Sequence, residues 1–165
     1  MGIEKVLLMG AILTTTVFVG IVILDSEDII DLPDYWDIES VCLNSHTSEI
    51  THYHVNVEII IDGDDYLIAN NIGIDDSDCP DGMRGIHTHD DTGKLHIETP
   101  SDMDATVGSF FNIWGENFDK DEILGNHENS DYEIVMYVNG KSNSEFEQYS
   151  MQNNDNIEIS YKQKY

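Results

Sequence analysis

Alternating apolar and polar residues beyond position 51 predict a series of short β-strands. Successive side chains of a strand point to opposite faces, so a period of two indicates one buried and one polar face. Turn residues separate the runs, and Asn139-Gly140 after the fifth run is a typical hairpin turn. The predicted strands are residues 52–61, 66–69, 84–90, 94–99, 133–138 and 156–161.

One segment has the period of a helix instead. Apolar side chains recur at helical spacing between Thr106 and Trp114, and Asp104 or Thr106 is placed to cap the first turn. A short helix among strands predicts an α+β, mainly β fold. We expect a mixed or antiparallel sheet or sandwich with one short helix.

The amino terminus contains an uncharged run of 19 residues, from Val6 to Leu24. At about 1.5 Å per residue such a helix just crosses a hydrocarbon core of about 30 Å. Lys5 precedes the run and acidic residues follow it, so we expect the following chain to lie outside the cytoplasm. A cleaved signal peptide is the alternative, but no Ala-x-Ala-like site precedes Asp25.

These features divide the chain into three parts. Residues 1–24 are expected to be a signal anchor that forms a transmembrane helix, and residues 25–50 an acidic neck. Residues 51–165 are expected to form a single β-rich extracytoplasmic domain, because the roughly 140 residues after the anchor suffice for one core but not two. This organisation places the protein in the cell membrane with a single pass.

The net charge of −26 limits the partners of this domain. Nucleic-acid binding requires clustered lysine and arginine. The chain has only seven such residues against 33 acidic ones, so no nucleic-acid partner is expected. The acidic runs at 62–65 and 75–78 resemble fragments of calcium loops, but neither completes an EF-hand. Turn formation is the favoured explanation for both runs.

The strongest indication of function is the distribution of histidine. The alternation within residues 52–61 places His52 and His54 on the polar face of one predicted strand. The sequence from Ile86 to Glu98 resembles a β-hairpin whose polar face holds three more histidines and a glutamate: His87, His89, His96 and Glu98.

The apolar residues of this hairpin constrain its register. A loop of even length places His89 opposite His96 and His87 opposite Glu98, with all four on one face. A loop of odd length would bring Leu95 and Ile97 onto the histidine face and disrupt the apolar side. The hydrophobic pattern therefore favours the register that gathers the imidazoles.

Several imidazoles beside a carboxylate are typical of a transition-metal site. We expect His87, His89 and His96 to be the first ligands, with His52 and His54 completing or adjoining the site. Glu98 or Asp90 is expected to act as a ligand or to orient one. Imidazole nitrogen suits copper and zinc, which predicts a copper- or zinc-binding protein for metal capture, storage or delivery.

Other functions fit the same residues. A metal-dependent hydrolase would need an open metal position and a base, which Glu98, Asp90 or Glu58 would supply. A surface that charges near pH 6.5, a purely structural polar face, or an accessory subunit of a membrane complex would need no metal. His46 and His127 lie in loop-like surroundings and are expected to be bystanders.

The two cysteines also allow two interpretations. Cys42 and Cys79 lack the spacing of a metal ribbon, and an exported chain with an even cysteine count permits one disulfide between them. Alternatively, Cys79 and Met83 would act as soft ligands beside His87, a combination that suits copper.

The histidine blocks also carry a family resemblance. His-Tyr-His-Val-Asn-Val-Glu-Ile-Ile-Ile-Asp-Gly, Asn-Ile-Gly-Ile, Ile-His-Thr-His-Asp-Asp-Thr-Gly-Lys-Leu-His-Ile-Glu and Thr-Val-Gly-Ser-Phe-Phe-Asn-Ile-Trp-Gly occur in that order. Over about residues 50–161 the chain resembles a family of uncharacterised exported, membrane-anchored His-rich proteins of archaea, including ammonia-oxidising lineages, and of some bacteria. The resemblance implies a single exported domain and the same five histidines. An origin in those copper-dependent archaea would favour copper.

Overall fold

The computed structural model describes residues 14–16, 37–44 and 51–164. The chain divides into two compact units, residues 1–35 and 36–165. In the first unit, residues 14–16 are helical. The rest of the predicted anchor over residues 6–24 lies outside the described residues. None of the helices in the described ranges is long and apolar enough to cross a membrane.

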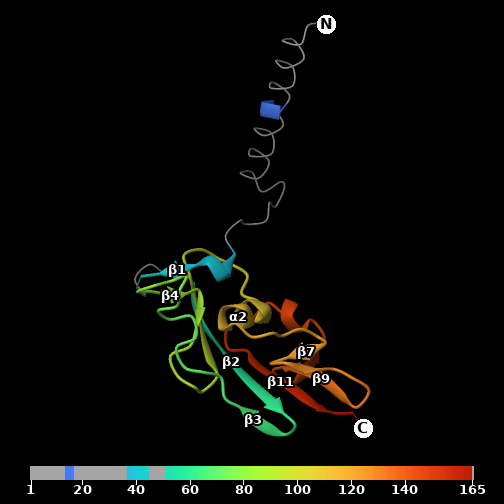
Figure 1. Cartoon of the computed structure of the whole chain (residues 1–165). Coiled ribbons are helices and arrows are strands. Elements are labelled where there is room, and N and C mark those ends of the chain that lie inside the picture. The colour runs from blue at the N-terminus through green and yellow to red at the C-terminus, as the bar shows by residue number, and fades with distance from the viewer. Residues whose placement is uncertain (1–13, 17–36, 45–50, 165) are drawn as a thin grey trace, which may run out of the picture. The chain divides into compact units, whose positions relative to one another are not determined.

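The second unit is built mainly of strands (Figure 1). A 3-10 turn η1 (Ile38–Ser40) is followed by five strands, β1 (Cys42–Leu43), β2 (Thr51–Ile61), β3 (Asp64–Tyr66), β4 (Met83–Arg84) and β5 (Ile86–His87). Next come β6 (Lys94–Thr99), helix α2 (Val107–Trp114), β7 (Glu122–Ile123), β8 (Asn126–His127), β9 (Tyr132–Val138) and β10 (Lys141–Asn143). A 3-10 turn η3 (Phe146–Gln148) and β11 (Asn156–Gln163) complete the unit.

The main sheet has the strand order β10-β9-β11-β2-β6-β5, and β3 also pairs with β2. β11 and β2 are parallel, whereas the other neighbouring strands are antiparallel. The connection between the parallel strands is long and includes α2. The predicted α+β, mainly β class with a mixed sheet and one short α-helix is therefore confirmed for the described residues.

Alternation along the strands determines where the core lies. Val55 and Val57 of β2, and Leu95 and Ile97 of β6, are buried on the face that packs with α2. Helix α2 begins as predicted, because the Thr106 side chain accepts a hydrogen bond from the backbone N–H of Ser109. The other face of the same strands carries the polar side chains.

Several predicted boundaries were wrong. The strand predicted at 66–69 corresponds to β3, which is Asp64–Tyr66. It begins earlier because Asp62 and Gly63, both with positive φ, form a tight turn directly after β2, so that Ile61 pairs with Asp64. The strand predicted over 84–90 is interrupted at Gly85 and ends at His87. Asn139 and Gly140 form the predicted hairpin turn, which leads into the unpredicted β10.

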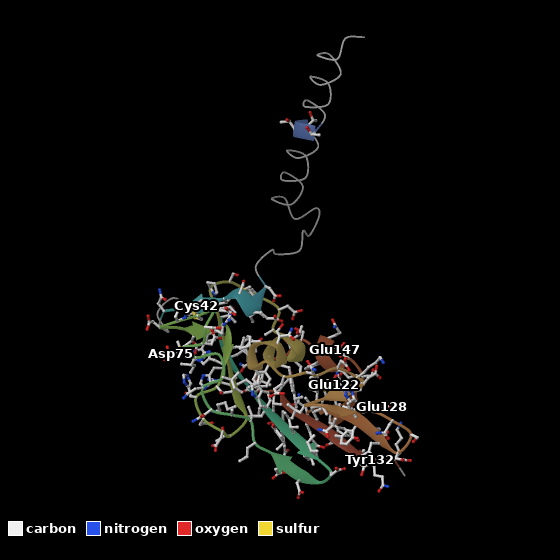
Figure 2. All side chains as sticks on the ribbon, in the orientation of Figure 1. Cys42, Asp75, Glu122, Glu128, Tyr132 and Glu147 are labelled. Atoms are coloured by element: carbon white, nitrogen blue, oxygen red, sulfur yellow. A yellow bond between two sulfur atoms is a disulfide. The ribbon has the colours of Figure 1, made fainter. Side chains whose placement is uncertain are left out.

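A disulfide joins Cys42 to Cys79, as one of the two interpretations predicted, with a Cα–Cα distance of 5.4 Å. The bond rules out Cys79 as a thiolate ligand. β1 also pairs with β4, opposite Arg84 and Met83. Only glycine fits at position 82, where an added Cβ would lie 2.8 Å from the Cys79 sulfur. Figure 2 shows Cys42 and Asp75 at one end of this unit and Glu128 and Tyr132 at the other.

Residues 37–44 belong to the segment that was expected to be a neck, and they pack on this unit. Ile38, Val41 and Leu43 are all buried. The ordered β-rich unit therefore includes residues upstream of position 51.

Candidate metal centre

Three neighbouring strands gather the predicted histidines on the polar face of the sheet. β6 lies between β2 and β5, and His96 on β6 is directly opposite His54 on one side and His87 on the other. His52 is opposite Glu98. Because directly opposite residues share a face, these side chains all point to the same side.

The predicted register between β5 and β6 was wrong by two residues. His87 faces His96 rather than Glu98, and His89 lies beyond the paired residues. The connection is longer than a two-residue turn because the Gly93 carbonyl accepts a hydrogen bond from the Val57 N–H and so ties this stretch to β2. A register shift of two residues leaves each side chain on the same face of the sheet, so the imidazoles still lie together as expected.

His96 lies in the middle of the imidazole cluster, which we define as His52, His54, His87, His89 and His96. Its ring centroid is 4.5 Å from that of His54 and 4.6 Å from that of His89. The corresponding distances to His87 and His52 are 5.4 and 6.0 Å.

The ring nitrogens fall into two groups that fit metal coordination. Each group brings one nitrogen from each of three rings within 4.8 Å of the others, and the groups are His52/His54/His96 and His87/His89/His96. The Nε2 atoms of His52 and His54 are 3.3 Å apart. Two nitrogens bound at about 2.05 Å to one tetrahedral zinc ion would be separated by about 3.3 Å. This first pair therefore already has the spacing of two ligands.

Glu98 adds a carboxylate to the cluster. Its side chain is fully buried, and Oε1 lies 3.3 Å from His52 Nε2. The same oxygen is 3.9 Å from His87 Nε2 and 3.9 Å from His96 Nδ1. A buried anion within reach of three imidazoles would offset the charge of a bound cation.

A backbone contact fixes which nitrogen His87 presents. Its Nδ1 lies 3.0 Å from the Arg84 carbonyl oxygen. Because a carbonyl only accepts, Nδ1 carries the proton of the neutral ring, and Nε2 is left as the lone-pair nitrogen facing the cluster. A hydrogen bond of this kind orients a metal-ligating histidine.

Arg84 is itself held in place by several contacts. Its guanidinium donates to Asp76 at 2.7 Å, to Asp78 at 2.8 Å and to the Glu39 carbonyl at 2.5 Å. Burial alone would raise the pKa of the Asp76 carboxyl, but bonds from Arg84, Cys79 and Asp78 lower it overall. The acidic run at 75–78 therefore forms a turn, as predicted, and its Asp76 and Asp78 also form ion pairs with Arg84.

Position 84 was not recognised in the sequence as part of the site. It holds the only arginine of the chain and lies three residues before His87. This feature was the one sequence indication that position 84 belongs to the site. Its role depends on the backbone carbonyl and on a pairing with distant residues, neither of which is visible in side-chain periodicity.

The cluster is uncharged at its centre at neutral pH. Burial, and then the proximity of His54, His87, His89 and His52, lowers the pKa of His96 to about 4. Burial and the neighbouring His52 and Lys94 also lower the pKa of His54. Neutral imidazole is the form that binds a metal. A central ring with this pKa stays neutral near pH 6.5.

The remaining candidates lie apart from the two histidine groups. Asp90 is exposed, and its Oδ1 accepts hydrogen bonds from the backbone and hydroxyl of Thr92 at the turn. His127 on β8 is 69% exposed and lies 3.7 Å from Glu122. His46 lies outside the described residues.

A groove of about 700 Å³ continues along the sheet beside the cluster. Asn56 and Glu58, on the same face of β2 as His54, contribute to its lining, as do Asp91, Glu158 and Lys162. The lining mixes polar and apolar residues, and four of its five charged side chains are acidic.

Comparison with family models, with curated proteins and with solved structures finds no match to this chain, so its geometry alone carries the functional argument.

Proposed function

We propose that this chain is an extracytoplasmic protein that captures, stores or delivers a transition metal, either copper or zinc. The observation that carries this proposal is the convergence of five imidazoles, with His96 at their centre, on one face of the sheet. We further propose that residues 1–24 hold the protein at the membrane as an uncleaved signal anchor. The disulfide Cys42–Cys79 supports a place in an oxidising compartment.

The donor set of the cluster favours particular ions. Imidazole nitrogens and one carboxylate oxygen are borderline to hard ligands, whereas soft thiolates select copper(I). Both cysteines are bound in the disulfide. Zinc(II) and copper(II) are therefore the ions that the cluster suits best.

The test is the metal content of the full chain, purified without a nickel column and measured by elemental mass spectrometry. We expect stoichiometric zinc or copper in the parent and its loss in a His87→Ala/His89→Ala/His96→Ala variant. His127→Ala is the matched control, because it removes an exposed imidazole outside the cluster. A parent that stays empty after exposure to both ions, or a triple variant that keeps its ion, would contradict the proposal.

A metal-dependent hydrolase is the second candidate, and the groove beside the cluster favours it. A cavity of about 700 Å³ is the size of a small-molecule site, and Glu58 lines it. Hydrolysis would need a metal-bound water and a base near the scissile bond. Turnover of activated esters by the zinc-loaded chain, lost in the triple variant and in Glu58→Gln, would support the enzyme. Metal binding without turnover would favour storage or delivery.

If the chain binds no metal, an accessory role within a membrane complex becomes the remaining proposal. Co-purification of a partner that depends on the polar face would support it.

A further inference from the structure

The strand order separates the imidazole cluster into two pairs. His52 and His54 come from β2, whereas His87 and His89 come from β5 and the residues directly after it. β6 lies between these strands, so the two pairs approach His96 from opposite sides. Each of the two nitrogen groups consists of one pair together with His96.

The ligand count exceeds the needs of a single ion. A tetrahedral zinc site takes four ligands, whereas this cluster offers five imidazoles and the Glu98 carboxylate. Because the described nitrogens form two groups of three with one shared member, the geometry resembles two adjacent sites more closely than one large site.

The shared ring can serve both sites. The two nitrogens of an imidazole flank one ring carbon and direct their lone pairs away from each other, and both can bind metal once the ring is fully deprotonated. His96 Nδ1 is buried and has no hydrogen-bond partner among the described residues, although it lies 3.9 Å from Glu98 Oε1. Its position directly opposite both His54 and His87 places it between the pairs.

We propose that the cluster is a binuclear centre, in which His52 and His54 hold one ion, His87 and His89 hold a second, and His96 bridges the two. This inference rests on the proposed metal-binding function and deepens it. Bridging requires the second ion to displace the remaining N–H proton of His96, which passes to solvent, and no electron is transferred. The ring then carries a negative charge between the two cations.

Glu98 is placed to favour two ions over one. The same Oε1 atom lies 3.3 Å from Nε2 of His52 in one pair and 3.9 Å from Nε2 of His87 in the other. A buried carboxylate at that position attracts both cations and reduces their mutual repulsion.

The test is a titration of the metal-free full chain with copper(II), followed by electron paramagnetic resonance and elemental analysis. We expect two ions per chain at saturation. The first equivalent should give an ordinary copper(II) signal, and the second should decrease the signal, because an imidazolate bridge couples two copper ions antiferromagnetically.

Two variants assign the ions to the pairs. His52→Ala/His54→Ala and His89→Ala each alter exposed or half-buried side chains and leave the buried His87 in place. Each should bind one ion with an uncoupled signal, while His127→Ala should behave as the parent. Circular dichroism is the check that each variant is folded.

Several results would overturn the binuclear centre. One ion at saturation, or two ions with additive, uncoupled signals, would contradict it while leaving the proposed metal-binding function standing. Loss of both ions in either pair variant would also contradict it, because the pairs would then belong to one site. Absence of any bound copper or zinc in the parent would reject both this inference and the proposed function.

Discussion

The two faces of β2 and β6 obey different physical rules although they share the same backbone. Ile97 is completely buried against the core, whereas its neighbour His96 points to the opposite face, with four other imidazoles around it. Apolar burial on the first face stabilises the fold. On the second face, burial and then the neighbouring imidazoles lower the pKa of His96, so its charged form is disfavoured. We conclude that the first face builds the sheet and the second uses it as a rigid support for ligands.

The largest difference between the two faces is expected when Ile97 and His96 are each replaced by alanine and the free energies of unfolding are compared. Ile97→Ala should lower the free energy of unfolding by about 2–5 kcal/mol, because it leaves a cavity in a close-packed core. His96→Ala in the metal-free chain should lower it by less than about 1 kcal/mol, since the half-buried ring makes no strong hydrogen bond at Nδ1 among the described residues. Urea unfolding of the full chain measures both. Equal effects would show that the histidine face is structural.

Removing the disulfide should have the next largest effect. The bond closes a segment with a sequence separation of 37, for which loop-closure entropy gives about 4 kcal/mol, with measured values of about 2–4 kcal/mol being typical. Cys42→Ser/Cys79→Ser should also weaken metal binding, because β1 pairs with β4, whose Arg84 carbonyl orients His87. Reduced stability with unchanged metal affinity would show that this clamp does not position the ligand.

The pH dependence of stability isolates the charge on the polar face. The pKa of His96 falls from 6.5 in the unfolded chain to about 4 in the folded chain. Between these values the unfolded state binds more protons, so stability falls as pH falls. The loss should be on the order of 1–3 kcal/mol between pH 6.5 and 4.

The control for this prediction is His96→Gln, which cannot titrate. Its unfolding free energy should fall less steeply over the same pH range, and the difference between the two slopes measures the titration of His96 together with its coupling to the neighbouring imidazoles. Parallel slopes for the parent and the variant would contradict the lowered pKa.

The smallest effect is expected at Asp90, which the sequence suggested as a ligand. Its exposed carboxylate receives hydrogen bonds within its own turn. Asp90→Asn should therefore leave both the stability and the metal content almost unchanged. Isothermal titration with zinc measures the stoichiometry and affinity of metal binding. A tenfold loss of affinity would identify Asp90 as a ligand.

Sequence periodicity predicted the two faces well, because alternation depends only on the local geometry of a strand. It placed Leu95 and Ile97 on one face and His96 and Glu98 on the other. This pattern alone predicted that the loop has an even number of residues. The actual pairing of His87 with His96 depends on how Gly93 bonds to β2, which is a contact between distant segments. The strand neighbours of β6 and the carbonyl of Arg84 were unpredictable for the same reason.

Short elements were missed for a local reason. The hairpin of β7 and β8 turns at Leu124-Gly125, where both residues have positive φ. Leucine rarely adopts this conformation, so the sequence carried no recognisable turn signal beyond the glycine.

The most direct test of the central claim is an equilibrium titration of the metal-free full chain with zinc in competition with a chromophoric chelator. We predict binding with a Kd well below about 1 μM for the parent and for His127→Ala, and loss of at least about 100-fold in affinity for His87→Ala/His89→Ala/His96→Ala, since several ligands are removed together. Equal affinities for the parent and the triple variant would place the metal elsewhere on this acidic chain and contradict the account.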